Sequence, residues 1–509
     1  MNTFFINTFT KEMETPKNQE QVLDFVSLGT IEDDILAMPT LYSVDTNGKY
    51  RLWTIYIGIT TNTEEPMKYL VPVDDNYINR EDLPKKSCGF YWTVSGIEGK
   101  KMTKSEYTYI HKGKYTGKKN YTTPFTQAII DARSLYNKKV KKGHNTNREA
   151  FKPADHVYSF EELLEDKSRD EYPWRVFAMA VHDYKKFKSK IHYPATIQRK
   201  LDGTLFIVVY HPNLPKIRVK FHRPSQYPDD DCIDINEISM DGYSRSRETY
   251  EKQDHIFEEL YPVLKKYPGL HLVGELWKKG YGLQEISGMS RRKLDIDTHG
   301  LKYVEFDYNV FDCFYIDQPE IGFEDRQYIL DDIFGCLSES GIDKSVIQRV
   351  QTYDVATEVE MLKYYKTFLK EKMEGAVVRN KDALYEFGVN KEIRSYQSLK
   401  IKPRPDAEWP VVGFTNGKGK ELGLIIWICA ENSDKPFSER KKFNVTPNQP
   451  ADARRNIFEK LSKEKEFFEK NIYGQNAVIS YSILSEAGLP QQPKMLRFRD
   501  EKIDKLLQE

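Results

Sequence analysis

Three absences limit what this chain can be. Its five cysteines are scattered without a C-x-x-C pair, which argues against a disulfide framework and against a zinc site. Its longest apolar run, residues 422–430, is far too short to span a bilayer. Its first residues lack a sustained apolar core with a small-residue cleavage site, so they do not resemble a secretory signal. We therefore expect reduced cysteines, no membrane span and an intracellular protein.

An excess of one charge sign is also missing, because 77 basic residues balance 77 acidic ones. The charges are nevertheless unevenly distributed. Residues 101–150 contain 12 Lys or Arg and only 3 acidic residues, which leaves an excess of nine positive charges. Such an excess displaces counterions from phosphates. Charge alone leaves two interpretations open, a basic patch for nucleic acid and a solvated lysine-rich surface.

The length of 509 residues suggests about three domains. Residues 1–35 are polar and are predicted to be a tail or a short helical leader. In a first module, residues 36–150, alternating apolar residues predict a hairpin around an Asn47-Gly48 turn. A helix is predicted from about Thr123, because apolar residues follow at helical spacing: Ala128, Ile129, Ala132 and Leu135.

The rest of the chain divides into three further parts. Residues 151–190 are charged and are predicted to be a linker with two helical stretches, Phe160–Glu165 and Trp174–Lys188. Residues 191–404 become rich in strand patterns. Residues 405–509 combine short strands, glycine turns and one helix, which predicts an OB-fold β-barrel. Its strands are expected at Leu424–Cys429 and Asn476–Leu484, and its helix near Ala453–Phe468. The predicted class is a multidomain α+β protein.

The first module resembles the WGR-type module found beside DNA-repair and nick-sensing enzymes. The resemblance rests on Trp92-Thr-Val-Ser-Gly96, Asn120, Gln127-Ala128 and a closing Lys-Lys-Gly143, and it covers about a hundred residues. The tripeptide that names the module is Trp-Thr-Val here, which leaves DNA binding and protein docking both open. Trp53 and Trp92 are expected in the core, because large aromatics in half-buried strands usually pack.

Lys200 begins a K-x-D-G sequence, Lys200-Leu-Asp202-Gly203, between two predicted strands. This pattern offers an amine in a tight loop, with a carboxylate two residues on and a glycine that lets backbone approach a ligand. A free lysine is almost wholly protonated near neutrality, so neighbouring cations or a metal must favour its neutral, nucleophilic form. Alone the pattern is weak, because four residues with one free position occur by chance.

Further motifs follow Lys200 in a fixed order. Each motif alone could instead be part of an ordinary core strand or lie on the solvent-exposed face of a strand. They are Tyr243-Ser-Arg-Ser246, Leu272-Val-Gly-Glu-Leu-Trp277, Gln284-Glu-Ile-Ser-Gly288, Val310-Phe-Asp312, Glu374-Gly-Ala-Val-Val-Arg379 and Ser398-Leu-Lys-Ile-Lys402. Together they resemble the ordered motif set of the covalent nucleotidyltransferases, which include polynucleotide ligases and messenger-RNA capping enzymes. The resemblance covers residues 195–509 and implies an adenylation domain of packed antiparallel sheets.

The resemblance implies a role for each matching residue. Lys200 attacks the α-phosphorus of ATP and becomes the lysyl-adenylate. The other implied nucleotide contacts are Arg245 and Glu275 at the ribose and phosphate side, Phe311 stacked on adenine, Glu374 at the metal, and Lys400 and Lys402 on the α-phosphate. The implied Mg²⁺ ligands are Asp202, Glu275 and Glu374. Two lysines at alternate strand positions share a face, where they can neutralise the phosphate charge.

Two positions depart from the usual DNA-ligase pattern. Leu205 stands two residues after the K-x-D-G glycine, where DNA ligases usually carry arginine, and this ending is more similar to that of some RNA ligases. Gln198 stands where an acidic residue is common, two positions before the lysine. Its carbonyl is expected to accept from the adenine amine, which favours ATP over GTP.

The C-terminal segment favours DNA over RNA. Arg497-Phe-Arg499-Asp-Glu-Lys502 resembles the ligase motif that reorients pyrophosphate, with Arg499 and Lys502 carrying the match. The resemblance therefore implies an ATP-dependent DNA ligase that joins 3′-hydroxyl and 5′-phosphate ends in DNA repair, replication and recombination. Nicked double-stranded DNA is the expected partner, and the chain is expected to act as a monomer.

Alternative functions remain open from the sequence. They are an ATP-dependent RNA ligase, a capping guanylyltransferase, and a DNA-binding scaffold with an inactive ligase core. The Lys-, Asn- and Tyr-rich composition and the unusual first module suggest a large virus or phage, with the protein in the cytoplasm or nucleus of the host cell or in a viral factory.

Overall fold

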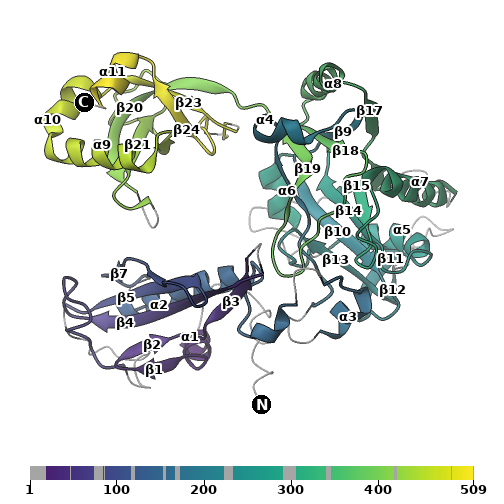
Figure 1. The fold of residues 1–509 in the computed structure, drawn as a ribbon, viewed down its shortest axis with the longest axis horizontal. Helices are drawn as coiled ribbons and strands as arrows, with labels where there is room; N and C mark the ends of the chain where they lie inside the picture. Colours follow the sequence, from purple (N-terminus) through teal and green to yellow (C-terminus); the bar gives the residue numbers. More distant parts are fainter. Residues whose placement is uncertain are drawn as a thin grey trace. The chain divides into compact units, whose positions relative to one another are not determined.

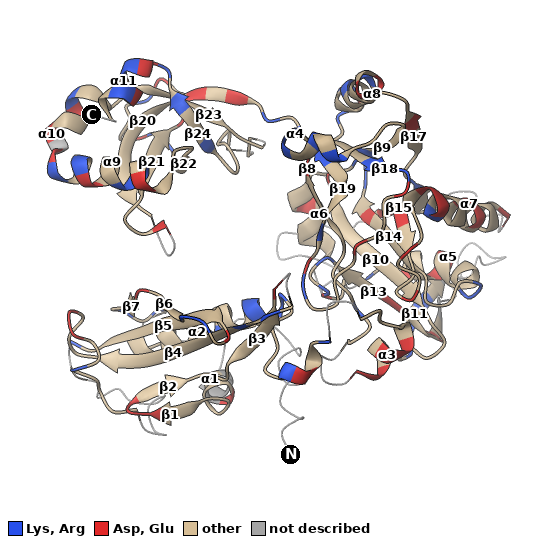
Figure 2. Cartoon of the chain, viewed as in Figure 1, with Lys and Arg blue, Asp and Glu red and all other residues tan. Residues whose placement is uncertain are grey.

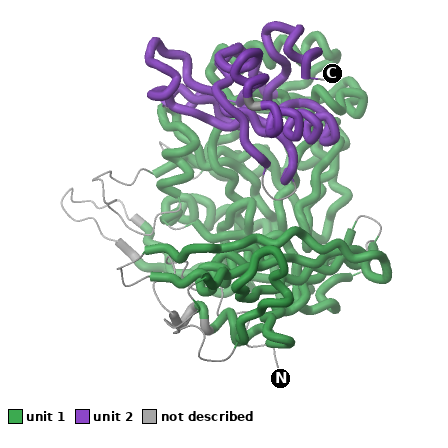
Figure 3. The backbone as a smooth tube through the Cα atoms, turned by 90° about the vertical axis from the view of Figure 1, so that its left-hand side faces the viewer, with its two compact units in different colours: residues 1–401 green, residues 402–509 purple. Residues whose placement is uncertain are grey.

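The computed structural model describes residues 19–507, apart from short gaps, and Figure 1 shows its fold. The gaps are residues 46–47, 74–83, 85, 116–120, 153–155, 167–171, 223–232, 251, 291–304, 340–344, 418–420, 483 and 486. Asn47 and Asn120, used in the sequence analysis, lie outside the described residues. The chain separates into two compact units, residues 1–401 and 402–509, coloured separately in Figure 3.

The N-terminal module is a seven-stranded sheet with two helices. Its elements are α1 (Gln19–Val26), β1 (Thr30–Glu32), β2 (Ile35–Ala37), β3 (Leu41–Val44), β4 (Tyr50–Thr60), β5 (Cys88–Ile97), β6 (Thr103–Lys104), β7 (Thr108–Ile110) and α2 (Pro124–Val140). The predicted hairpin is present, with β3 antiparallel to β4. α2 begins where the sequence indicated, because the Thr123 hydroxyl accepts from the Thr126 N–H and satisfies a free donor of the first turn.

The first residues of this module are more completely folded than the sequence predicted. A helix is present in this segment, α1, but a tail does not match the structure from Gln19 onward, because Phe25 of α1 is fully buried and β1 and β2 lie in the sheet. These elements are difficult to predict from the sequence, because α1 has only two turns and β1 and β2 have three residues each. Trp53 and Trp92 are 7% and 5% exposed, so their predicted place in the core is confirmed.

Two five-stranded sheets form the rest of the first unit, in the orders β13-β10-β14-β15-β16 and β17-β9-β18-β19-β8. Neighbouring strands are antiparallel except for two parallel pairs, β15 with β16 and β19 with β8. α5 and α7 pack against the first sheet and α8 packs against the second (Figure 1).

The helical elements of this part are η3 (Arg148–Ala150), α3 (Phe160–Glu165), α4 (Tyr184–Phe187), η4 (Lys188–Lys190), α5 (Asp254–Leu264), α6 (Leu283–Ser290), α7 (Phe323–Glu339) and α8 (Glu358–Lys370). The strands are β8 (Ala180–Asp183), β9 (Ala195–Lys200), β10 (Thr204–Tyr210), β11 (Ile217–His222), β12 (Ile233–Ile238), β13 (Met240–Ser244), β14 (His271–Trp277), β15 (Asp307–Phe314), β16 (Ile347–Arg349), β17 (Thr352–Val355), β18 (Gly375–Asn380) and β19 (Arg394–Ile401). β11 and β12 form a separate two-stranded sheet.

The predicted linker, residues 151–190, differs from the structure in its second half. The helix predicted over Trp174–Lys188 is wrong for most of its length, because residues 180–183 form β8 at the edge of the second sheet. Ahead of β8, the Arg175 guanidinium donates to both carboxylate oxygens of Asp241, at 2.6 and 2.7 Å. The Trp174 indole donates to the same carboxylate at 2.7 Å. This segment is therefore part of the folded core.

The second unit contains a closed barrel with the strand order β20-β21-β22-β24-β23. Its elements are β20 (Asp406–Asn416), β21 (Ile425–Ala430), β22 (Lys442–Pro447), α9 (Ala451–Lys463), α10 (Lys465–Asn471), β23 (Asn476–Ser480), β24 (Lys494–Phe498) and α11 (Glu501–Leu506). The single helix expected near Ala453–Phe468 is two helices, α9 and α10. The OB-fold assignment stays a prediction.

The described residues bear on two expectations, reduced cysteines and the lack of a membrane span. Their four cysteines, Cys88, Cys313, Cys336 and Cys429, are free. None of their helices has the length and apolar character needed to cross a membrane.

Candidate active site

Lys200 is the last residue of β9, and the loop that follows leads directly into β10, as the sequence predicted. Its Nζ lies 2.5 Å from Oε2 of Glu374, and both side chains are about one-fifth exposed at 21%. The backbone fixes this pair, because the Glu374 N–H donates to the Lys200 carbonyl at 3.0 Å. The amine is thus held at the end of an interior strand, and its side chain remains partly accessible to solvent.

Gly203 and Glu275 face each other beside this lysine. The Gly203 N–H donates to Oε1 of Glu275 at 3.2 Å. A Cβ at position 203 would lie 2.4 Å from the Leu276 carbonyl oxygen, so this close approach requires glycine. Burial raises the pKa of Glu275, while the Lys200 charge and the Gly203 N–H act in the opposite direction. Leu205 lies opposite Glu275 on the neighbouring strand.

Lys400 brings a further positive charge to the same region of the sheet. It lies on β19, opposite Val377 of β18, which in turn lies opposite Gln198 of β9. Burial lowers the pKa of Lys400 below its usual range. Neighbouring cations lower it further: Arg394, Lys200 and Arg245.

Two other predicted cations, Arg245 and Lys402, are exposed to solvent. Arg245 is exposed, in the turn that follows β13. Lys402 is exposed as well, and it is the first residue of the second unit. Of the predicted cations, Lys200 and Arg245 therefore both act on the charge of Lys400, as does Arg394.

Gln198, predicted to contact adenine, is buried and hydrogen-bonded to three other strands. Gln198 is 1% exposed, and its carbonyl accepts from Nη1 of Arg379 at 2.5 Å. Its amide donates to the Phe311 carbonyl at 3.0 Å and to the Thr352 hydroxyl at 2.8 Å. The side chain thus joins β9 to β15, β17 and β18, and its contact with adenine stays a prediction. Phe311, the predicted adenine platform, is half-buried beside it.

A buried ion pair that the sequence analysis did not identify lies behind Phe311. Arg326 and Asp312 are 1% and 0% exposed, and the guanidinium donates to both carboxylate oxygens at 2.7 and 3.1 Å. Burial lowers the pKa of Arg379 to about 10, and the charge of Asp312 opposes that shift. One carboxylate therefore offsets two buried guanidiniums. No local pattern marks this pair, because its partners come from a strand and a helix.

The predicted metal ligands do not gather into a site. Among the described residues, no group of three or more His, Cys, Asp or Glu side chains could hold a metal ion. Of the three predicted ligands, Glu374 is paired with Lys200, and Glu275 accepts from the Gly203 backbone. Mg²⁺ binding by Asp202, Glu275 and Glu374 stays a prediction, and no chemical step is derived from it.

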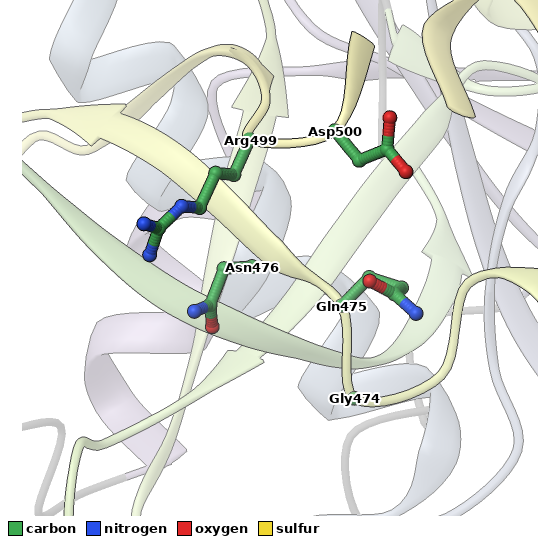
Figure 4. Close-up of a pocket in the computed structure, with 5 residues that line it drawn as sticks. All are labelled: Gly474, Gln475, Asn476, Arg499 and Asp500. Carbon is green, nitrogen blue, oxygen red and sulfur yellow. The ribbon is translucent and has the colours of Figure 1, made fainter. Parts of the chain in front are cut away.

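Arg499 and Lys502 lie at one end of the barrel in the second unit. Arg499 Nη1 lies 2.8 Å from Oε2 of Glu408, and its side chain is 68% exposed. Lys502 is in the first turn of α11, where its N–H donates to the Asp500 carboxylate at 3.0 Å. Figure 4 shows a pocket of about 350 Å³ beside Arg499, lined by Gly474, Gln475, Asn476, Arg499 and Asp500.

An amine paired with a carboxylate and accompanied by two further cations suits nucleophilic attack on a phosphate. Its place between two packed, largely antiparallel sheets is the arrangement predicted for a covalent nucleotidyltransferase. Fold and site together thus fit that class of enzyme.

Comparison with known proteins narrows the class. Residues 232–402 match the family described as ATP dependent DNA ligase domain, a range that includes Glu275, Glu374 and Lys400. DNA ligases of two African swine fever virus isolates, Badajoz 1971 Vero-adapted and Tick/South Africa/Pretoriuskop Pr4/1996, are each 28% identical over 478 residues, covering 93% of this chain and 97% of theirs. A solved Chlorella virus DNA ligase-adenylate is 18% identical, with a TM-score of 0.31 over 64% of this chain and 99% of that one. Residues 232–402 therefore match an ATP-dependent DNA ligase domain, and the resemblance predicted from the sequence is confirmed.

Proposed function

We propose that this protein joins 3′-hydroxyl and 5′-phosphate ends at nicks in duplex DNA through an adenylate carried on Lys200. The observation that carries the proposal is the position of Lys200, whose Nζ lies 2.5 Å from Oε2 of Glu374 and whose charge, with that of Arg245, lowers the pKa of Lys400. The match to an ATP-dependent DNA ligase domain over the following strands supports ATP and DNA as the substrates.

The reaction proceeds through three transfers at phosphorus. First, Lys200 Nζ attacks the α-phosphorus of ATP, a phosphorus–nitrogen bond forms, and pyrophosphate leaves. Next, an oxygen of the 5′-phosphate at the nick attacks the adenylate, and the lysine leaves. Finally, the 3′-hydroxyl attacks the activated 5′-phosphate and expels AMP. Each transfer depends on positioning and charge neutralisation rather than on covalent chemistry by other residues.

The neighbouring residues supply that positioning. Glu374 holds the Lys200 amine in place and can receive its proton when the lysine becomes nucleophilic. Lys400 and Arg245 offset the negative charge that develops on the phosphate. Phe311 stacks on adenine, and Gln198 fixes the position of the Phe311 backbone relative to β9.

Nucleotide labelling and sealing assays test the proposed function. Labelled ATP should mark the protein, and nicked duplexes with deoxyribose at both ends should be joined. Labelling by GTP alone would indicate a capping enzyme, and no labelling would indicate an inactive scaffold. Nicked duplexes that differ only in the sugar at the nick distinguish joining of DNA from joining of RNA. Joining of RNA is the competing function, because Leu205 stands where DNA ligases usually carry arginine.

Arg499→Ala should reduce self-adenylation far more than sealing of a nick that is already adenylated. The reason is the proposed role of Arg499, which acts on the pyrophosphate leaving group, and this group takes part only in the first transfer. Arg455→Ala, which removes an exposed arginine of α9, serves as the control. Equal losses in the two assays would refute a role limited to pyrophosphate.

Removal of residues 1–150 should weaken binding to nicked duplex and leave lysine adenylation nearly unchanged. We propose that this module binds DNA, because its residues 101–150 carry an excess of nine positive charges and residues 36–150 resemble a WGR-type module. The plot of log affinity against log salt should be shallower for the truncated protein, by about 0.9 for each phosphate that the module neutralises. Gel-shift titrations at three salt concentrations measure both slopes. Parallel slopes would instead favour a protein-docking module.

A further inference from the structure

A lysine-rich segment lies on the edge of the second sheet, outside every motif used so far. Residues 184–193 contain four lysines and no acidic residue. All four lysines are exposed to solvent, and Lys188 also lies 3.6 Å from Glu358. Figure 2 shows the basic colouring along α4, where this segment packs beside β19. The local charge is therefore positive on a part of the chain first predicted to be a linker.

Aromatic rings lie next to these lysines. Tyr396 is 47% exposed, and its ring is stacked on that of His182, with centroids 4.1 Å apart and planes 27° from parallel. Phe187 supports both rings, at 5.1 Å from Tyr396 and 4.6 Å from His182. Tyr396 lies where the pairing of β19 with β8 is irregular, between Ser395 and Leu399. Such irregularities commonly re-aim a side chain near an active site.

This surface is close to the reactive lysine. In the sheet, β8 is three strand positions from β9, which carries Lys200. At a spacing of about 4.8 Å between strands, the separation is roughly 14 Å, which corresponds to about four base-pair rises of 3.4 Å. Lys400 lies on the path between them, opposite Asp183 of β8. A DNA strand that reaches Lys200 can therefore reach this surface within a few nucleotides.

We propose that the α4 surface, defined as His182, Lys185, Lys186, Phe187, Lys190 and Tyr396, holds one strand of the nicked duplex beside the active site. The exposed lysines contact phosphates, and the outer face of the Tyr396 ring packs against a sugar or base of the same strand. Lysines that neutralise phosphates, interleaved with exposed aromatic rings, are the combination used for binding single strands of nucleic acid. This inference rests on the proposed function, since it assigns a place for that substrate.

The lysines and the tyrosine should have different signatures in binding measurements on the full-length protein. Replacing Lys185, Lys186 and Lys190 together by alanine should weaken binding to nicked duplex and reduce the slope of log affinity against log salt by about 0.9 for each phosphate that these lysines neutralise. The matched control replaces three exposed lysines of α8: Lys363, Lys366 and Lys370. Equal slopes for the two triple variants would overturn the proposal.

Tyr396→Ala should weaken binding by about ten-fold without changing the salt slope, because stacking involves no counterion release. Tyr396→Phe should retain the wild-type affinity, since it keeps the ring. Tyr328→Ala, which removes a 62% exposed tyrosine of α7, is the control. A loss for Tyr396→Ala no larger than for Tyr328→Ala would overturn the role of the ring.

The same assays separate this proposal from the proposed function. All variants should still be labelled by ATP at the wild-type rate, which also shows that they are folded. If the wild-type protein is labelled but the α4-surface variants bind DNA normally, only the α4 surface is refuted. If the wild-type protein is not labelled by ATP, the ligase function itself fails.

Discussion

Lys200→Ala should abolish labelling of the protein by ATP and leave its fold intact. No other amine in the motif set lies at the end of β9 beside Glu374, so no alternative nucleophile is available. The substitution removes a partly exposed side chain, which makes a large loss of stability unexpected. The measurement is transfer of labelled AMP to the protein, with thermal unfolding as the check on folding.

Two further variants sharpen this result. Lys200→Arg keeps a positive charge next to Glu374, but a guanidinium does not lose its proton near neutrality and is not a nucleophile. It should therefore be as inactive as Lys200→Ala. Lys216→Ala removes an exposed lysine between β10 and β11 and should be labelled normally. Label on either Lys200 variant would contradict the assignment of the nucleophile.

Asp312→Ala should lower the free energy of unfolding by about 3–5 kcal/mol, because breaking a buried ion pair leaves an uncompensated charge. The charge left behind belongs to Arg326, which is 1% exposed and retains only its bonds to the carbonyls of Ile321 and Ala383. Arg379 would also lose the carboxylate that offsets its charge.

Chemical denaturation measures this loss of stability, from the unfolding transition of the first unit. Asp325→Asn on α7 is the matched control, because Asp325 is exposed, and a surface change of this kind usually shifts stability by less than about 0.5 kcal/mol. A loss for Asp312→Ala as small as that of the control would show that water or local rearrangement compensates the buried guanidinium.

The parts of the molecule that were predictable from sequence are those specified by local pattern. The hairpin of β3 and β4 and the start of α2 follow from alternation, a glycine and a capping threonine. The end of β9 at Lys200 and the tight loop that follows it agree with the K-x-D-G sequence between two apolar runs. In each instance neighbouring residues in the chain determine the structure.

The features that the sequence did not reveal depend on residues far apart in the chain. The Gln198 carbonyl accepts from Arg379, which is 181 residues away. The segment over Trp174–Lys188 has apolar residues compatible with a helix, but pairing with β19 selects a strand for residues 180–183. Neither partner is visible in the local sequence, so tertiary contacts decided the outcome.

The edge strand β8 determines where this protein can be divided for expression. A fragment that begins at residue 191, the predicted start of the adenylation domain, would lack β8 and Arg175. The carboxylate of Asp241 would lose its buried partner, and β19 would become an open edge available for pairing with other chains. A shortened ligase that stays soluble therefore has to begin ahead of Trp174, so that the sheet keeps its own outer strand.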